Sequence, residues 1–231
     1  MKKIFGFLGV LLVGALCLTG CSLGGDDSSK LNVNVNAPEG MEMKTYVSYE
    51  KDYLIIKVKN GGSEDIGAYE VKAVYYDENG NKLDDDFDSG FNFKSGTEMV
   101  LSLDMPQDSN YDPIIPAKID LTFETDAEYQ SVVGADKLYN ESIKTSYTEG
   151  STEISVNAKN ASQYELDTVI VVAFMKNGKI ISIEDLSGDL EPNESITEQV
   201  EIPEDWESEN DELIKYDDIK IFVNEASYHE D

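Results

Sequence analysis

The chain has 231 residues, with 47 aspartates and glutamates against 18 lysines, no arginine and a single histidine, so its formal net charge is −29. This charge repels polyanions. Without arginine the chain also has no guanidinium group to make bidentate hydrogen bonds with phosphates or base edges. Both features exclude nucleic acid as a partner. The length suits one large domain or two of about 100 residues each.

The N-terminal segment resembles the signal of a bacterial lipoprotein. Lys2 and Lys3 precede an apolar run over 4–16, and the motif Leu-Thr-Gly-Cys follows at 18–21. This order predicts a signal peptide over 1–20 that is cut after Gly20, and a diacylglycerol on Cys21. The run is shorter than the roughly 20 apolar residues of a membrane span. The alternatives are an ordinary secretory signal in which the cysteine is incidental, and an uncleaved anchor.

A chain processed in this way would be held at the cell membrane, on its extracytoplasmic face, by the lipid on Cys21. Two acyl chains give durable anchoring where one does not. Loss of Lys2 and Lys3 takes the formal charge to −31, so the folded part should stand off anionic lipid heads. Cys17 leaves with the signal peptide, and no thiol then remains for a disulfide.

Residues 21–36 are predicted to form a flexible tether. The sequence from 22 onward is rich in glycine, serine and aspartate and has little apolar content. A random coil of this length reaches about 20 Å. The tether would therefore clear the lipid surface.

After the tether, the sequence changes to short β-rich runs separated by turn signals, without helical spacing. Runs with the period of two that a half-buried strand requires lie at 69–75, 99–105 and 119–123. Residues 50–52 are predicted to form one hairpin loop. Asn79-Gly80 predicts another, because both central positions of a type I′ turn need positive φ. Together these runs predict a β-sandwich over 37–126.

The second half of the chain repeats the first at offsets of 97 to 100 residues. The matches are Lys44-Thr45 with Lys144-Thr145, Lys59-Asn60 with Lys159-Asn160, Asn79-Gly80 with Asn177-Gly178, Ser89-Gly90 with Ser187-Gly188, Met105-Pro106 with Ile202-Pro203, and Ile119-Asp120-Leu121 with Ile219-Lys220-Ile221. Offsets that drift by a few residues are typical of a duplicated domain with indels in its loops. A second sandwich is therefore predicted over 143–231. The connector over 127–142 is expected to be a loop with at most one helical turn.

The order of these features resembles the FxLYD type of bacterial extracellular domain. In the first copy the resemblance rests on Tyr75-Tyr76-Asp77, Asn79-Gly80 and Lys94-Ser95-Gly96, and the second copy has Met175-Lys176 in place of the Tyr-Asp pair. The resemblance implies an all-β fold class, with two tandem immunoglobulin-like β-sandwich domains after the signal peptide. It implies a secreted or lipid-anchored protein and supplies no catalytic residues.

Residues able to carry chemistry are scarce. The one histidine, His229, is the third residue from the end of the chain, where side chains are usually solvated. No thiol nucleophile, buried triad or Ser-x-x-Lys arrangement is expected in the mature chain. We therefore expect no catalytic residues, no cofactor and no enzyme activity.

An acidic stretch over 83–90 is the best local candidate for a metal site. Asp84, Asp86 and Asp88 alternate as ligands do in a calcium loop. The glycine falls at position seven instead of six, and Ser95 stands where such a loop has glutamate. A charged, solvated loop is the favoured interpretation, and residues 108–112 form a second acidic loop of the same kind.

Aromatic side chains give a further possibility, because exposed rings can stack on sugars or pack against a protein. The candidates are Tyr76, Phe87, Phe91, Phe93 and Tyr111. Packing in the core is the alternative, since tyrosine and phenylalanine favour strands. Trp206 is expected to anchor a loop of the second copy.

These features predict a non-catalytic binding module of the cell envelope. Its partner would be an envelope protein, a peptide or a wall polymer, in addition to the membrane reached through Cys21. The alternative from another class is a calcium-dependent or carbohydrate-binding accessory module of a secreted enzyme system. A catalytic role ranks third.

Overall fold

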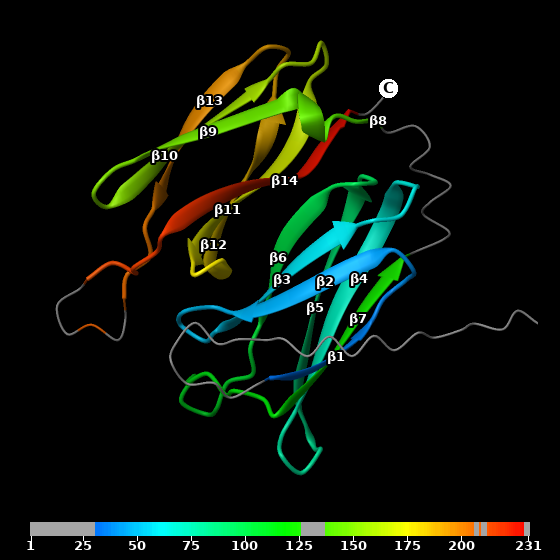
Figure 1. Ribbon diagram of the computed structural model, residues 1–231, viewed down its shortest axis with the longest axis vertical. Helices are drawn as coiled ribbons and strands as arrows, with labels where there is room; N and C mark the ends of the chain where they lie inside the picture. Colours follow the sequence, from blue (N-terminus) through cyan, green and yellow to red (C-terminus); the bar gives the residue numbers. More distant parts are fainter. Residues whose placement is uncertain (1–30, 126–136, 206–207, 209–211, 229–231) are drawn as a thin grey trace, which may run out of the picture.

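The computed structural model describes residues 31–125, 137–205, 208 and 212–228, and Figure 1 shows the arrangement of their strands. Gly20, Cys21, Trp206 and His229 lie outside the described residues, as do most of the predicted tether and connector. In the part of the chain that is described, no helix has the length and apolar character needed to cross a membrane.

Two sheets form the first half of the molecule, defined here as residues 31–125. The strands are β1 (Asn32–Asn36), β2 (Met41–Val47), β3 (Tyr53–Asn60), β4 (Ile66–Tyr76), β5 (Lys82–Phe93), β6 (Glu98–Asp104) and β7 (Lys118–Thr125). One sheet has the order β1-β7-β4-β5 and the other β2-β3-β6. Their facing side chains form one core, with Leu54, Tyr75 and Phe93 among its largest members.

The second half, residues 137–228, has the same plan. Its elements are β8 (Lys137–Leu138), the 3₁₀ turn η3 (Asn140–Ser142), β9 (Ile143–Glu149), β10 (Glu153–Asn160), β11 (Leu166–Lys176), β12 (Lys179–Leu190), β13 (Ser195–Glu201) and β14 (Asp218–Tyr228). The sheet orders are β12-β11-β14-β8 and β13-β10-β9, so β9 to β14 repeat the places of β2 to β7. The predicted all-β sandwich fold is confirmed.

The prediction of a flexible tether as far as residue 36 is wrong from Leu31 onward. Residues 32–36 form β1, which pairs in parallel with β7, and the side chains of Leu31 and Val33 are buried in the first core. The sequence Asn-Val-Asn-Val-Asn has the period of a strand with one buried face. Its asparagines face away from the core, and they gave the segment the polar composition of a linker.

The two Asn-Gly dipeptides make different turns. Asn177 and Gly178 have φ of 53° and 74° and form the two-residue turn that joins β11 to β12. Between β4 and β5, only Gly80 has positive φ, at 81°. That turn spans residues 77–81, and the Asp77 carboxylate accepts the backbone N–H groups of Asn79 and Asn81, both at 2.8 Å. The predicted hairpin is present, but a side chain replaces the type I′ geometry.

The repeated Lys-Asn dipeptide contains a buried asparagine in each half. Asn160 donates through Nδ2 to the carbonyls of Tyr164 (2.7 Å) and Leu190 (2.9 Å), and its Oδ1 accepts the N–H of Ser162 at 2.8 Å. Asn60 makes the equivalent bonds to the carbonyls of Glu64 and Phe93 and to the N–H of Gly62. Each asparagine therefore ties the loop after its own strand to the end of the next hairpin.

The glycine of the repeated Ser-Gly dipeptide is required in only one half. Gly90 lies opposite Tyr69 across β4 and β5, and a Cβ at position 90 would collide with the Tyr69 hydroxyl. The Tyr69 ring is itself stacked on Phe123 at 5.6 Å. A Cβ at Gly188 would meet nothing within 4 Å.

Candidate functional site

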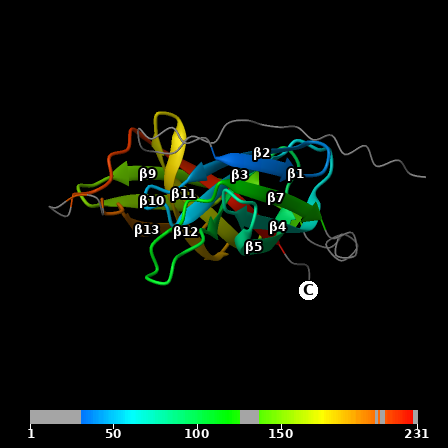
Figure 2. The same ribbon diagram turned by 90° about the horizontal axis from the view of Figure 1, so that it is seen from below.

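The two halves are packed against each other through the outer faces of two sheets, a contact called the junction below. Ile55 of β3 and Val100 of β6 meet Val171 of β11 and Phe222 of β14, and all four side chains are at most 5 % exposed. In Figure 1 the second half lies above the first, and in the view along the long axis the two overlap (Figure 2). Apolar residues on both faces of β3, β6 and β11 make this packing possible.

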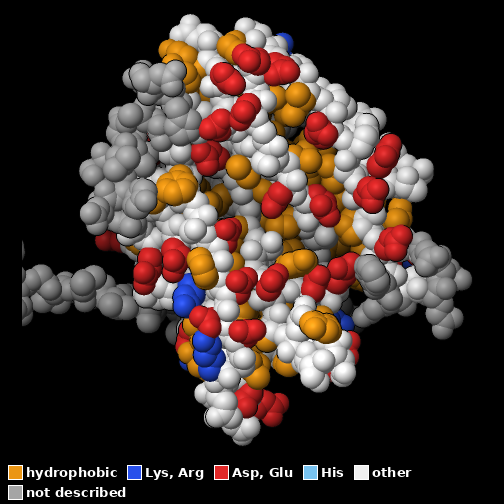
Figure 3. All heavy atoms as spheres, turned by 180° about the vertical axis from the view of Figure 1, so that it is seen from behind, with side chains coloured by type: hydrophobic (Ala, Val, Ile, Leu, Met, Phe, Trp, Pro, Cys, Tyr) orange, Lys and Arg blue, Asp and Glu red, His pale blue; other side chains and the backbone are white. Residues whose placement is uncertain are grey.

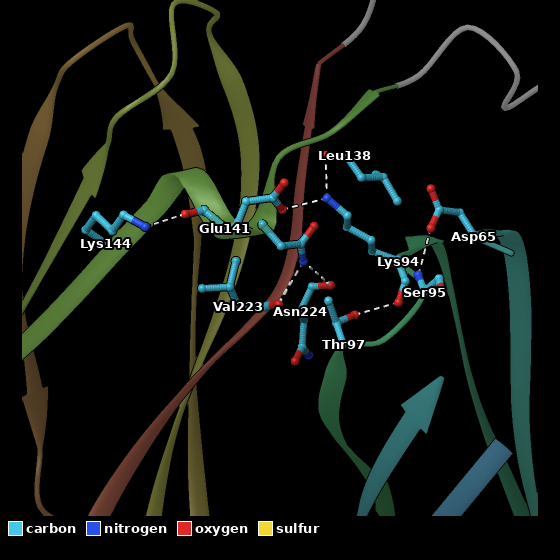
Figure 4. Close-up of polar contacts among 10 residues, drawn as sticks. Asp65, Lys94, Ser95, Thr97, Leu138, Glu141, Lys144, Val223 and Asn224 are labelled. Atoms are coloured by element: carbon cyan, nitrogen blue, oxygen red, sulfur yellow. Dashed lines mark hydrogen bonds and ion pairs between the residues drawn. The ribbon is translucent and has the colours of Figure 1, made fainter. Parts of the chain in front are cut away.

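Polar contacts join the halves at one end of the junction (Figure 4). Lys94 of the first half donates to the Glu141 carboxylate at 2.5 Å and to the carbonyl of Leu138 at 3.2 Å. This contact with Lys94 holds the pKa of Glu141 below its usual value. The Asn224 side chain accepts the N–H of Val100 at 3.0 Å and donates to its carbonyl at 2.7 Å. Its amide therefore completes the hydrogen bonding of the β6 backbone at Val100.

The middle of the junction is lined by paired charges. Lys57 forms an ion pair with Glu98 at 2.8 Å, and Lys220 of the second half approaches the same carboxylate at 3.6 Å. Both ammonium groups lie over the Phe222 ring, at 5.5 and 4.9 Å from its centroid. Cation–π attraction in this partly buried place adds to the ion pairs.

The opposite end of the junction contains a cleft of about 400 Å³. Its wall includes Ser48, Tyr49, Glu50, Asp52, Tyr53, Ile55 and Ser102 of the first half, and Ser182, Ile183, Glu184, Asp185, Pro203 and Ile214 of the second. Tyr49 crosses between the halves, with its N–H donating to the carbonyl of Ile181 (2.7 Å) and its hydroxyl to Asp205 (2.9 Å). The cleft therefore lies between surfaces that are already in contact.

Two carboxylates of β12 line this cleft, and together with three carboxylates of the first half they form a set that we call the acidic seam. It consists of Asp86 and Asp88 on β5, Asp104 on β6, and Glu184 and Asp185 on β12. Partial desolvation raises the pKa of Asp185, and the charge of Asp88 raises it further. In the described part of the chain, no lysine forms an ion pair with a member of the seam. On the face in Figure 3, acidic side chains cover both halves and lysines are few.

The calcium candidates belong to a strand and not to a loop, so the loop prediction is wrong. Asp84, Asp86 and Asp88 alternate because β5 has a period of two. Their carboxylates accept the backbone N–H groups of Asp85 (2.9 Å), Asp104 (2.7 Å) and Ser89 (2.8 Å), respectively. Among the described residues, no three acidic, histidine or cysteine side chains are placed to hold a metal ion. Calcium binding stays a prediction that this geometry does not support.

The second acidic loop, residues 108–112, is held by hydrogen bonds within the loop. The Asp108 carboxylate accepts the N–H groups of Asn110 at 2.7 Å and Asp112 at 3.1 Å. These bonds hold the pKa of Asp108 below its usual value. One oxygen of this side chain therefore stabilises the turn.

The aromatic candidates divide into exposed and buried residues. Phe87, Phe91 and Tyr111 are 59, 52 and 81 % exposed. Phe93 is buried in the first core, and Tyr76 is half-buried. Phe87 and Phe91 lie four residues apart on β5, so both rings are on the outer face of its sheet. With Leu83, which is 36 % exposed, they form a line that we call the β5 strip.

Sequence reasoning missed the junction, although one signal for it was available. Leu54-Ile55-Ile56 and Met99-Val100-Leu101 are continuous apolar runs in an antiparallel sheet, where alternation is expected if one face is solvated. Such runs indicate a strand that is covered on both faces. Asn224 and Asn92, which donates to Glu225 of the other half at 2.9 Å, gave no comparable signal, because polar residues in strands are common on solvated faces.

Comparison with known proteins places the chain in no family. No family model matches it, and no curated protein matches it. Among solved structures, a red sea bream transglutaminase has a TM-score of 0.23 at 12 % identity, covering 70 % of this chain and 26 % of its own. A β-glucuronidase of Bacteroides uniformis has 0.20 at 12 % identity, with 65 and 21 % covered, and a family 2 β-glucuronidase has 0.17 at 7 %, with 77 and 22 % covered. This chain spans about a quarter of the length of these structures.

Proposed function

We propose that the chain is a lipid-anchored, extracytoplasmic binding protein of the cell envelope that acts without catalysis. The motif that ends at Cys21 supports the location. The observation that carries the binding role is the β5 strip, in which Phe87 and Phe91 expose more than half of their surface on a regular strand. Aromatic residues left on a rigid surface are the usual anchors of a protein interface.

The partner proposed for the β5 strip is a basic protein or peptide of the envelope. The chain has a large negative charge, and acidic side chains outnumber lysines on the face in Figure 3. Opposite charge on a partner would speed association and would make it sensitive to salt. A wall polymer is the second candidate, because exposed rings can also stack on sugars.

Replacement of Cys21 by serine tests the location. The Cys21→Ser chain is expected to move from the membrane fraction to the soluble extracytoplasmic fraction, because it lacks the two acyl chains. The Cys17→Ser chain is the matched control and should stay in the membrane fraction. If Cys21→Ser fractionates with the membrane as the unaltered chain does, the signal acts as an uncleaved anchor and the lipid is not needed.

A photo-reactive amino acid at position 87 or 91 tests the binding surface in cells. We expect the same cross-linked product from both positions and a weaker one in high salt. Tyr147, an exposed aromatic residue on β9 of the other half, is the control position and should give no such product. Equal cross-linking from positions 91 and 147 would contradict the proposal. A product sensitive to wall hydrolases instead of proteases would favour the polymer.

A further inference from the structure

Three Asn-Gly dipeptides occur in the chain, and the structure places them in different surroundings. They are Asn60-Gly61, Asn79-Gly80 and Asn177-Gly178. In such a dipeptide the backbone nitrogen of the glycine can attack the side-chain amide carbon of the asparagine, because glycine has no Cβ to hinder the approach. The reaction needs an asparagine side chain that is free to move and a glycine N–H that can lose its proton. The surroundings of each pair therefore decide its reactivity.

The first pair is fixed at both of the groups that would react. The Asn60 side chain is 1 % exposed, and its amide group donates to the carbonyl of Glu64 and accepts the N–H of Gly62, both at 3.0 Å. The N–H of Gly61 donates to the carbonyl of Gly40 at 2.9 Å. This pair is therefore protected by the fold.

The second pair is exposed but is restrained by Asp77. The N–H of Gly80 donates to the Asp77 carbonyl at 3.1 Å. Hydrogen bonds from Asn81, and then from Asn79 through both its N–H and its side chain, hold the pKa of Asp77 below its usual value. The negative charges of Asp77 and Glu78 beside the dipeptide oppose loss of the Gly80 amide proton.

The third pair has neither kind of protection. Asn177 and Gly178 are exposed in the turn between β11 and β12. The backbone N–H of Asn177 donates to the Asp217 carboxylate at 2.7 Å, but its side chain and the Gly178 N–H make no hydrogen bond with the described residues. Lys176 and Lys179 flank the dipeptide, and their positive charges favour loss of the Gly178 amide proton.

We propose that Asn177-Gly178 is a site of spontaneous deamidation in the folded protein, and that isoaspartate at position 177 weakens the β11–β12 hairpin beside the junction. The Gly178 nitrogen loses its proton and forms a bond to Cγ of Asn177, the Cγ–Nδ2 bond breaks, and the side-chain nitrogen leaves as ammonia. Water then opens the succinimide ring at either carbonyl and gives aspartate or isoaspartate. No oxidant, reductant or cofactor takes part.

Isoaspartate disturbs the hairpin in two ways. It inserts a methylene group into the main chain of a two-residue turn in which both residues have positive φ, at 53° and 74°. It also adds a carboxylate to the residue whose N–H is bonded to the Asp217 carboxylate, and the like charges repel. The strands that leave this turn contain Met175 and Ile180, which pack in the junction with Ile55. A weaker hairpin therefore loosens one edge of the junction.

Incubation of the full chain at mildly alkaline pH in heavy-oxygen water tests the site. Mass spectrometry of its peptides measures the oxygen that each opened succinimide has taken up, so deamidation before the incubation is not counted. We expect the Asn177 peptide to be deamidated several-fold more than the Asn79 peptide, and the Asn60 peptide least. In denaturant the three rates should converge, because the hydrogen bonds that separate them are lost.

Two variants serve as controls. Asp77→Ala removes the restraint on the second pair and should bring the rate at Asn79 toward that at Asn177. Asn177→Asp adds the negative charge without lengthening the main chain, so its melting temperature should lie between those of the unmodified chain and the isoaspartyl fraction separated by chromatography. The proposal is overturned if Asn177 is deamidated no faster than Asn79 in the folded protein. It is also overturned if the isoaspartyl fraction melts at the same temperature as the unmodified chain.

Discussion

Asn160→Ala is expected to lower the free energy of unfolding by about 2–4 kcal/mol. The asparagine is fully buried, and its amide group bonds the carbonyls of Tyr164 and Leu190 and the N–H of Ser162. Alanine leaves these buried backbone groups unpaired, at a cost of about 1–3 kcal/mol for each group that water cannot reach. Denaturant unfolding followed by circular dichroism measures the loss.

Asn157→Ala is the control for this substitution. Asn157 lies on the same strand and is only half-buried, and its Nδ2 donates to the carbonyl of Ile196 at 3.0 Å. Water can replace that bond, so the cost should be below about 1 kcal/mol. Asn60→Ala should resemble Asn160→Ala, because Asn60 makes the equivalent bonds. Equal losses for Asn157→Ala and Asn160→Ala would show that the buried asparagine does not stabilise the fold in this way.

Val171→Asp is expected to separate the two halves. Val171 is 1 % exposed in the junction, packed with Ile55 and Val100, where a carboxylate would be removed from water. Burying an unpaired charge there would cost several kcal/mol, which exceeds the typical effect of a surface change. Separation lets water reach the charge. Small-angle scattering should therefore show a larger radius of gyration, with strand content retained in circular dichroism.

Val169→Asp is the control for the junction. Val169 precedes Val171 by two residues on β11 and is only half-buried. Its replacement should change stability by less than about 1 kcal/mol and leave the radius of gyration unaltered. If Val171→Asp has the scattering curve of the unaltered chain, the apolar junction does not hold the halves together.

The strands could be predicted from local sequence because a half-buried strand requires period-two alternation, as at Tyr69, Val71, Ala73 and Tyr75. The repeat between the halves could also be predicted from local sequence, and its Lys-Asn dipeptide contains a buried asparagine in each half. β1 was missed because its alternate residues are asparagines, so its composition outweighed its periodicity. The length of chain assigned to the tether was wrong for the same reason.

The acidic stretch on β5 was taken for a loop because aspartate is depleted in strands. An edge strand has different requirements from a central one, and charged residues are common there. The junction could not be predicted, because it depends on which surfaces of two separate sandwiches meet. In the sequence, Ile55 and Val171 do not differ from apolar strand residues that face the core of their own half. Phe87 and Phe91 were among the aromatic candidates, but sequence alone did not separate them from buried Phe93.

The capped backbone of β5 has a consequence for copies of the chain crowded on one surface. A long edge strand with free N–H groups is a template on which a neighbour's strand can add, and repetition of that step builds fibrils. Asp84 and Asp88 occupy the N–H groups of Asp85 and Ser89, and their charge repels another acidic chain. Two short side chains thus hinder strand addition along a sheet margin of twelve residues.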